Sequence, residues 1–142
     1  MRRGISLVEI LMVLFIGGLC AGLALPRFAG WLDAIATDAA ARDVTTALAV
    51  TRNAAVMWGT RARLRIAPDS LRIDRFEDDE WRPFARWAGA ASRGATLEVS
   101  NPEVTFGPTG VGWGAANTTV VVKKGTHSAT VVMSRLGRVR RE

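Results

Sequence analysis

The side chains that perform most catalytic chemistry in proteins are scarce in this sequence. It has one cysteine, Cys20, and one histidine, His127, and neither belongs to a Ser/His/Asp set or lies near a paired carboxylate. A single thiol and a single imidazole, without carboxylates in ligand spacing, do not predict a metal site. We therefore expect a protein that is not an enzyme and that holds no metal or other cofactor.

Glu9 is the one chemically conspicuous residue near the N-terminus. From Ile5 to Leu25 the only polar side chains are those of Ser6 and Glu9. At a rise of about 1.5 Å per residue, a helix of this length crosses a hydrocarbon layer of about 30 Å. A carboxylate inside such a helix costs about 2.5–3.5 kcal/mol on insertion scales. Glu9 therefore needs a proton or a cationic partner, unless it lies at headgroup depth and is solvated.

The residues before this segment indicate how it is oriented. Arg2 and Arg3 precede Gly4, and the apolar run begins directly after the glycine. Basic residues at one end of a spanning helix favour the cytoplasmic side for that end. We therefore expect a single pass with a cytoplasmic N-terminus and an exported remainder.

Gly4, followed by Ile-Ser-Leu-Val-Glu, resembles the class III signal of type IV pilins and pseudopilins. The resemblance implies that a prepilin peptidase cleaves after Gly4 and methylates the amino group of Ile5. Most members of the family begin with Phe or Met, so Ile5 departs from the pattern. The resemblance also implies that Glu9 pairs with the N-terminal ammonium of a neighbouring subunit during filament assembly.

A second helical stretch follows the apolar segment. Between Arg27 and Trp58 apolar residues recur at intervals of three and four, many of the others are alanine, and Gly59 stands at the position of a C-terminal cap. The spacing predicts a helix that ends near Trp58.

Beyond Gly59 the period changes to two, which is typical of strands. Leu64 and Ile66 alternate with arginines, and the β-branched runs 118–122 and 128–134 flank a Lys-Lys-Gly-Thr turn. We interpret the acidic run 77–80 as a solvated turn and the aromatic residues of 81–87 as core, while 77–94 matches no known pattern.

The expected fold is α+β: a long N-terminal helix, membrane-spanning in its first half, packed on a mainly antiparallel β-sheet. Its expected parts are a leader (1–4), a transmembrane and filament-core segment (5–28), a soluble half-helix (29–58) and a β-rich head (59–142).

The head resembles the GspH/FimT domain of pilin-like proteins. The residues that resemble it are Phe-x-Pro-x-Gly at 106–110, the final hairpin, and the terminal pair Gly137-Arg138. The resemblance implies a minor subunit of a type II secretion pseudopilus or a type IV pilus, in the inner membrane and then in a periplasmic or cell-surface filament. Its partners would be other pilin or pseudopilin subunits, the peptidase and secreted cargo.

The arginine-rich end of the chain leaves a second function open. The stretch 135–141 contains Gly-Arg-x-Arg and so resembles FimT-like competence pilins, and this resemblance implies DNA capture during natural transformation. Cations on one surface neutralise phosphates and give salt-sensitive binding without sequence preference; the candidates are Arg138, Arg140, Arg141, Lys123 and Lys124. The alternative is an arginine-rich strand end in solvent, and the structural role is favoured because Gly-Arg endings also occur in the secretion-type relatives; a formal charge of +6 fits either interpretation.

Overall fold

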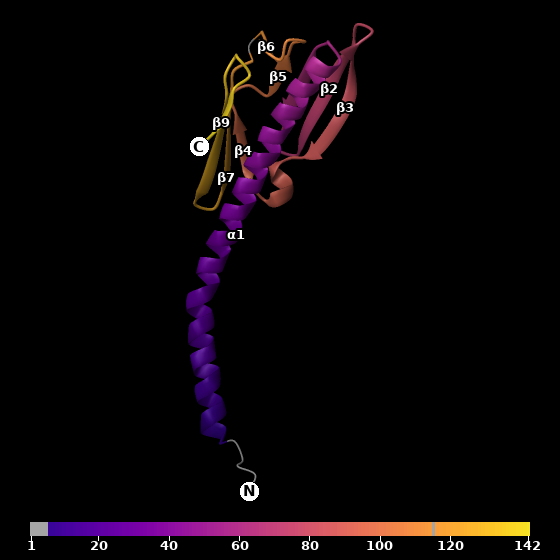
Figure 1. The fold of residues 1–142 in the computed structure, drawn as a ribbon. Helices are drawn as coiled ribbons and strands as arrows, with labels where there is room; N and C mark the ends of the chain where they lie inside the picture. The colour runs from indigo at the N-terminus through magenta and orange to yellow at the C-terminus, as the bar shows by residue number, and fades with distance from the viewer. Residues whose placement is uncertain (1–5, 115) are drawn as a thin grey trace. The chain divides into compact units, whose positions relative to one another are not determined.

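The computed structural model describes residues 6–114 and 116–142, with the backbone alone for residues 24–26. Its contacts divide the chain into two units, residues 1–32 and 33–142. The elements, in chain order, are α1 (Leu7–Met57), β1 (Ala62–Ile66), β2 (Ser70–Glu77), β3 (Glu80–Ala88), η1 (Ala90–Arg93), β4 (Thr96–Val99), β5 (Glu103–Phe106), β6 (Gly112–Trp113), β7 (Thr118–Lys124), β8 (His127–Met133) and β9 (Val139–Arg141) (Figure 1).

The first unit contains the N-terminal part of α1. Its described side chains are almost all exposed, and the large apolar ones among them include Leu7, Leu14, Phe15, Ile16 and Leu23. Within the described residues, α1 is the one helix that is long and apolar enough to cross a membrane. An apolar surface open on every side is stable in hydrocarbon or against other apolar helices.

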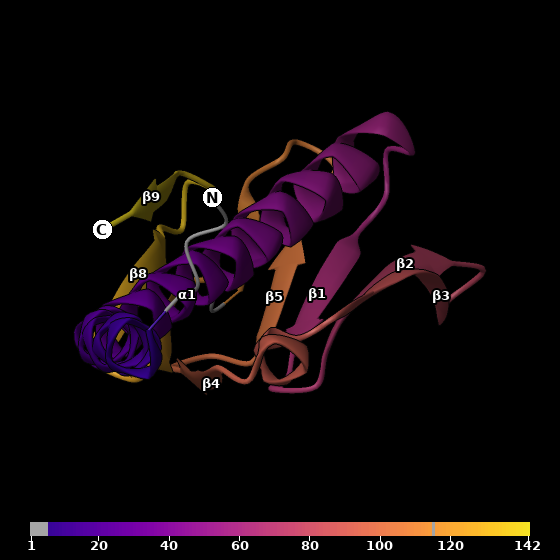
Figure 2. The same cartoon turned by 90° about the horizontal axis from the view of Figure 1, so that it is seen from below.

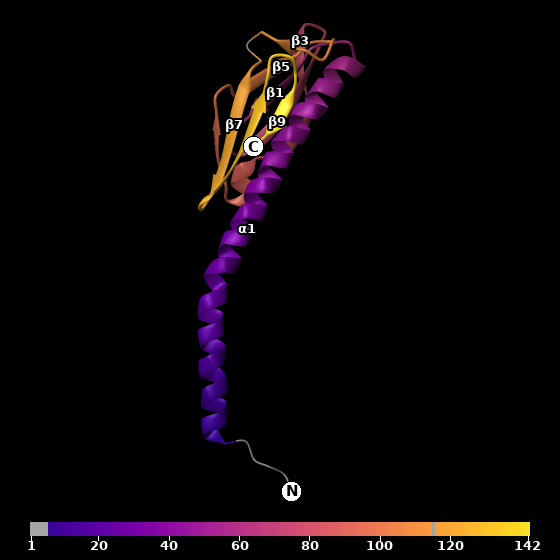
Figure 3. The ribbon, with the colours of Figure 1, turned by 60° about the vertical axis from the view of Figure 1, so that its left-hand side comes forward.

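The second unit contains two antiparallel sheets. The strand order is β3-β2-β1-β5-β6 in the five-stranded sheet and β4-β7-β8-β9 in the four-stranded sheet. The part of α1 that belongs to this unit runs across both sheets, as Figures 2 and 3 show from two directions. This arrangement confirms the predicted α+β class.

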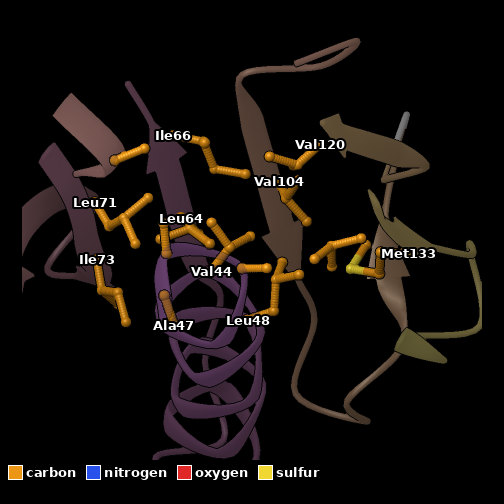
Figure 4. Close-up of a cluster of buried hydrophobic side chains, with 14 of the residues drawn as sticks. Val44, Ala47, Leu48, Leu64, Ile66, Leu71, Ile73, Val104, Val120 and Met133 are labelled. Carbon is orange, nitrogen blue, oxygen red and sulfur yellow. The ribbon is translucent and has the colours of Figure 1, made fainter. Parts of the chain in front are cut away.

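The buried face of α1 packs on both sheets. Small residues recur at intervals of three and four along it, with Val44, Leu48 and Thr51 between them. These side chains meet those of both sheets in one core (Figure 4), formed on the sheet side by Leu64, Ile66, Leu71, Ile73, Val104, Phe106, Val120, Val122, Val131 and Met133. The alanines occupy little space on this face, and Leu48 is fully buried in the core.

The end of α1 and the main hairpins agree with the sequence predictions. The helix ends at Met57, and Gly59 has a φ of 59°, the left-handed conformation of a helix cap. Leu64 and Ile66 lie in β1, which pairs with β2, and the two β-branched runs form the hairpin of β7 and β8.

Residues 77–94, which no sequence pattern explained, form β3 and η1. Strand β3 pairs with β2 through a two-residue turn at Asp78 and Asp79, and a register shift interrupts the pairing at Ile73/Asp74. The predicted core position is wrong for Phe84, which is 45% exposed and packs edge-on against Trp58 with ring centroids 4.7 Å apart. The register shift changes which face of the sheet the later β3 side chains occupy, so a simple spacing rule fails here.

Candidate functional site

Two regions contain the residues that the sequence singled out, and each is described within its own unit. In the first unit, Gly4 and Ile5 lie outside the described residues. Glu9 lies in the first turn of α1, is exposed, and has no ion-pair partner among the residues that the structure describes. Its neighbours along the helix, Val8 and Ile10, are also exposed, so the carboxylate lies on a helix that is otherwise apolar.

Aromatic and basic side chains follow the apolar segment. Arg27, Phe28 and Trp31 line a shallow hollow, and the Phe28 and Trp31 rings meet edge to face with centroids 6.3 Å apart. Aromatic and basic residues are enriched where a spanning helix meets the membrane surface. These residues therefore indicate where the spanning part of α1 would leave the membrane.

In the second unit, the five candidate cations do not form one surface. Lys123 and Lys124 end β7, beside the β7–β8 turn, whereas Arg138 lies at the other end of β8, where the chain turns into β9. Lys123 forms an ion pair with Glu98 at 2.9 Å. Lys124 pairs with Asp33 at 3.6 Å and donates a hydrogen bond to the Arg93 carbonyl at 2.9 Å.

The C-terminal arginines lie in or beside β9, a strand that the sequence did not predict. Strand β9 pairs with β8, so successive side chains point to opposite faces of the sheet. Val139 packs against the core, and Arg141, on the same face, forms an ion pair with Asp38 of α1. Arg140 points to the other face and is exposed. Arg141 therefore holds β9 against the helix and is less available to an anion than Arg140.

Three aspartates of α1 bind cations from the β-rich part of the chain in the same way. Asp33 pairs with Lys124, Asp38 with Arg141, and Asp43 with Arg93, the last at 2.7 Å. Exposed ion pairs contribute about 0–1 kcal/mol each. Together they connect α1 to the end of β7, to β9 and to η1.

A groove of about 410 Å³ lies between α1 and β9. Arg52 of α1, Arg138 and Arg140 line it together with Asn53, over a floor that includes Leu48, Phe106 and Val139. All three arginines are exposed, and none of them forms an ion pair with a residue in the described ranges. The groove therefore lies along the edge of β9, with Arg52 on its α1 side, and Arg138 and Arg140 also line a second hollow with Val132, Ser134 and Leu136.

The sequence did not predict the place of Arg52, which depends on two distant turns. Gly110 and Gly137 have φ values near +74° and lie against the Arg52 side chain. The two turns are joined by a hydrogen bond from the Gly112 N–H to the Arg135 carbonyl, at 3.0 Å. The Phe-x-Pro-x-Gly segment and the Gly-Arg pair thus meet at one place and form the wall of the groove.

Comparison with known proteins relates this architecture to pilin-like proteins. The family model of the type II transport protein GspH matches residues 40–137. The pilin-like protein PilA1 of Thermus thermophilus is 28% identical over 99% of each chain. The minor pilin FimU of Pseudomonas aeruginosa has a similar fold (TM-score 0.64, 17% identity, 75% of this chain and 87% of that chain).

The minor pseudopilin EpsH from the type 2 secretion system of Vibrio cholerae also has a similar fold, with a TM-score of 0.61 and 15% identity over 75% of this chain and 95% of that chain. At such identities the two crystal structures establish the fold. The family model, in contrast, covers most of the chain and includes the Phe-x-Pro-x-Gly segment and Gly137. The chain belongs to the GspH family of pilin-like proteins, whose members are structural filament subunits and not enzymes.

Proposed function

We propose that this chain is a minor subunit of a type II secretion or type IV pilus-like filament, cut by a prepilin peptidase between Gly4 and Ile5 and inserted through its apolar helix. The family supports assembly with other pilin or pseudopilin subunits. The names of the relatives are divided between a minor pilin and a minor pseudopilin, so both kinds of filament fit the proposal. Secreted cargo would be a further partner in the second kind.

Before assembly, the first part of α1 would cross the inner membrane once. Arg2 and Arg3 would hold its N-terminal end in the cytoplasm, and Arg27 and Trp31 would lie at the opposite interface. The β-rich head would then be periplasmic, and it would reach the cell surface if the filament does.

Exposed Glu9 is the observation that carries this proposal. Its carboxylate has no cationic partner in the described part of the chain and lies among apolar side chains that any membrane or helix bundle would cover. Cleavage after Gly4 would create an ammonium group at Ile5. In a filament, the ammonium of one subunit would neutralise Glu9 of the next, so assembly would remove the cost of burying the charge.

Processing is tested by expressing the full chain in membranes with and without a prepilin peptidase and measuring its mass. The proposal predicts a product that begins at Ile5, with or without one methyl group, only when the peptidase is present. Gly4→Val should block cleavage, and Ser6→Ala should not. A chain that keeps its first residues, or that is cut at a small residue after the apolar segment, would contradict the proposed signal.

DNA capture is the second candidate function, and the exposure of Arg138 and Arg140 favours it. Neither is neutralised by a described carboxylate, whereas Lys123, Lys124 and Arg141 each have one. The test is duplex binding by the full chain in detergent across a salt series. Binding that falls steeply with salt and is lost with Arg138→Ala/Arg140→Ala, but is kept with Lys123→Ala, would support DNA capture. Absence of binding at low salt would remove this candidate.

A further inference from the structure

One face of the five-stranded sheet points away from α1. Leu64 and Ile66 of β1 lie in the core beside Val44 of α1 (Figure 4). Successive side chains of a strand alternate between the two faces of the sheet, so Arg63 and Arg65 lie on the opposite face. We call the surface formed by these arginines and their cross-strand neighbours the outer face.

Aromatic rings surround Arg61 at one end of the outer face. Its guanidinium carbon is 3.9 Å from the ring centroid of Phe76. The ring centroids of Trp113 and Trp81 are 5.7 Å and 6.0 Å from the same carbon. Trp113, in the edge strand β6, is 57% exposed. A β-carbon at Gly107 would be 3.1 Å from its ring, so the glycine leaves space for the ring to lie against the sheet.

Three arginines form a row across the sheet at the other end of the outer face. Arg65 in β1 is directly opposite Arg72 in β2, and Arg72 is directly opposite Arg86 in β3. All three are exposed, and the last two line a hollow of about 340 Å³ with residues 83–85. Like charges directly opposite each other destabilise a sheet. An anion bound at this row would relieve that repulsion.

The carboxylates of this face neutralise only some of its arginines. Arg61 and Arg72 have no ion pair with any residue in the ranges 6–114 and 116–142. The other three arginines do, and their partners are Asp74, Glu103 and Asp69. Because Arg72 lies opposite the residue four positions after Arg61, the two are roughly 13 Å apart along the strand direction. A few nucleotides, at about 3.4 Å or more each, cover this distance.

We propose that the outer face binds single-stranded nucleic acid, with a base stacked on Trp113 and phosphates beside Arg61 and Arg72. Aromatic rings and cations on one sheet face bind single strands with little sequence preference, because every base has a flat face to stack. A carboxylate has no such ring, so exposed Trp113 favours nucleic acid over an acidic protein segment. One subunit contains the whole site, and its residues are separate from Arg138 and Arg140 of the other sheet.

Binding of a labelled oligothymidylate of about twelve nucleotides to the full chain in detergent tests the site. Fluorescence anisotropy measures the affinity across a salt series. Trp113→Ala should weaken binding about tenfold, and Trp113→Phe should restore most of it, because the ring is what stacks the base. Trp31→Ala is the matched control, since Trp31 is also an exposed tryptophan but lies in the first unit, and it should leave the affinity unchanged.

The salt dependence tests the arginines separately from the ring. Arg72→Ala should reduce the slope of log affinity against log salt concentration by about 0.7, the value for one phosphate of a single strand. Arg82→Ala removes the same charge from β3, where Arg82 lies opposite Arg75 and pairs with Asp78. That control should leave the slope unchanged, because its side chain lies on the other face of the sheet.

Several outcomes would overturn the proposal. One is equal affinity of the native chain and Trp113→Ala. Another is a duplex of the same length that binds as tightly as the single strand, or polyglutamate of the same charge that displaces it equally well. Binding lost with Arg138→Ala/Arg140→Ala but kept with Trp113→Ala would assign single strands to the C-terminal segment instead. None of these results bears on cleavage after Gly4, so the filament role and this site fail separately.

Discussion

Gly137 lies so close to Gly110 that a β-carbon added at Gly137 would be 3.0 Å from the Gly110 carbonyl oxygen. The two glycines are far apart in the sequence, and each adopts a positive φ. Their approach positions the turn before β9 and, with it, Arg138 at the edge of the groove. Gly137 of the Gly-Arg pair therefore has a structural role in this turn, and Arg138 is the residue of the pair that could bind a ligand.

Gly137→Ala should destabilise the chain by about 1–3 kcal/mol, because it adds backbone strain and a clash with the Gly110 carbonyl. Gly114→Ala is the matched control: Gly114 also has a positive φ, but a β-carbon there would meet nothing within 4 Å. Denaturant unfolding of both variants separates strain from crowding. Equal losses for the two variants would show that the contact with Gly110 has no energetic weight.

Leu48→Ala should lower the free energy of unfolding by about 2–5 kcal/mol, because a fully buried leucine would leave a cavity between α1 and the sheets. Thr46→Ala, at an exposed position one half-turn away, should change it by less than about 0.5 kcal/mol. Thermal or urea unfolding of the two variants measures the difference. A Leu48 variant as stable as the Thr46 variant would contradict the packing in Figure 4.

Asp79→Gly should stabilise the β2–β3 hairpin by about 0.5–1 kcal/mol. Asp79 has a φ of 62°, which glycine adopts without strain and which two-residue hairpin turns require. Asp69→Gly is the control, because Asp69 is exposed in a turn and does not have a positive φ. That substitution should destabilise slightly through the entropy of the unfolded chain. A loss of stability with Asp79→Gly would show that the aspartate contributes more than its conformation costs.

Arg141→Ala and Arg140→Ala should differ although the residues are adjacent. Arg141 pairs with Asp38 of α1, so its removal should cost up to about 1 kcal/mol at low salt and less at high salt. Arg140 has no such partner in the described part of the chain, so Arg140→Ala should leave stability unchanged. Unfolding experiments at two salt concentrations measure both effects. An equal, salt-independent loss in the two variants would contradict the assigned ion pair.

The sequence predicted those parts of the fold that depend on local patterns. Alternation at Leu64 and Ile66 identified β1, and Gly59 marked the end of α1, because burial on one face and positive φ are local requirements. Strand β9 escaped prediction because Val139 is its only apolar residue. Residues of β3 were ambiguous because the register shift at Ile73/Asp74 disrupts simple alternation.

The groove could not be predicted, because its residues come together only through tertiary contacts. Arg52 is one of many polar residues on α1, and nothing in its neighbours along the sequence indicates that Gly110 and Gly137 will lie against it. The cations that the sequence grouped with the C-terminal arginines turned out to have acidic partners, which no local pattern shows. Predicting which cations are free to bind a ligand therefore requires knowing which acidic side chains the fold places beside each of them.

Glu9 provides the most direct test of the filament role. The measurement is the amount of full-length chain recovered in sheared filaments from cells that express the assembly system, compared between the native chain, Glu9→Ala and Ser6→Ala. Our account predicts that Glu9→Ala is processed and stays in the membrane but is lost from filaments, whereas Ser6→Ala assembles normally. Glu9→Ala subunits recovered in filaments at the native level would contradict the pairing of Glu9 with the new N-terminus.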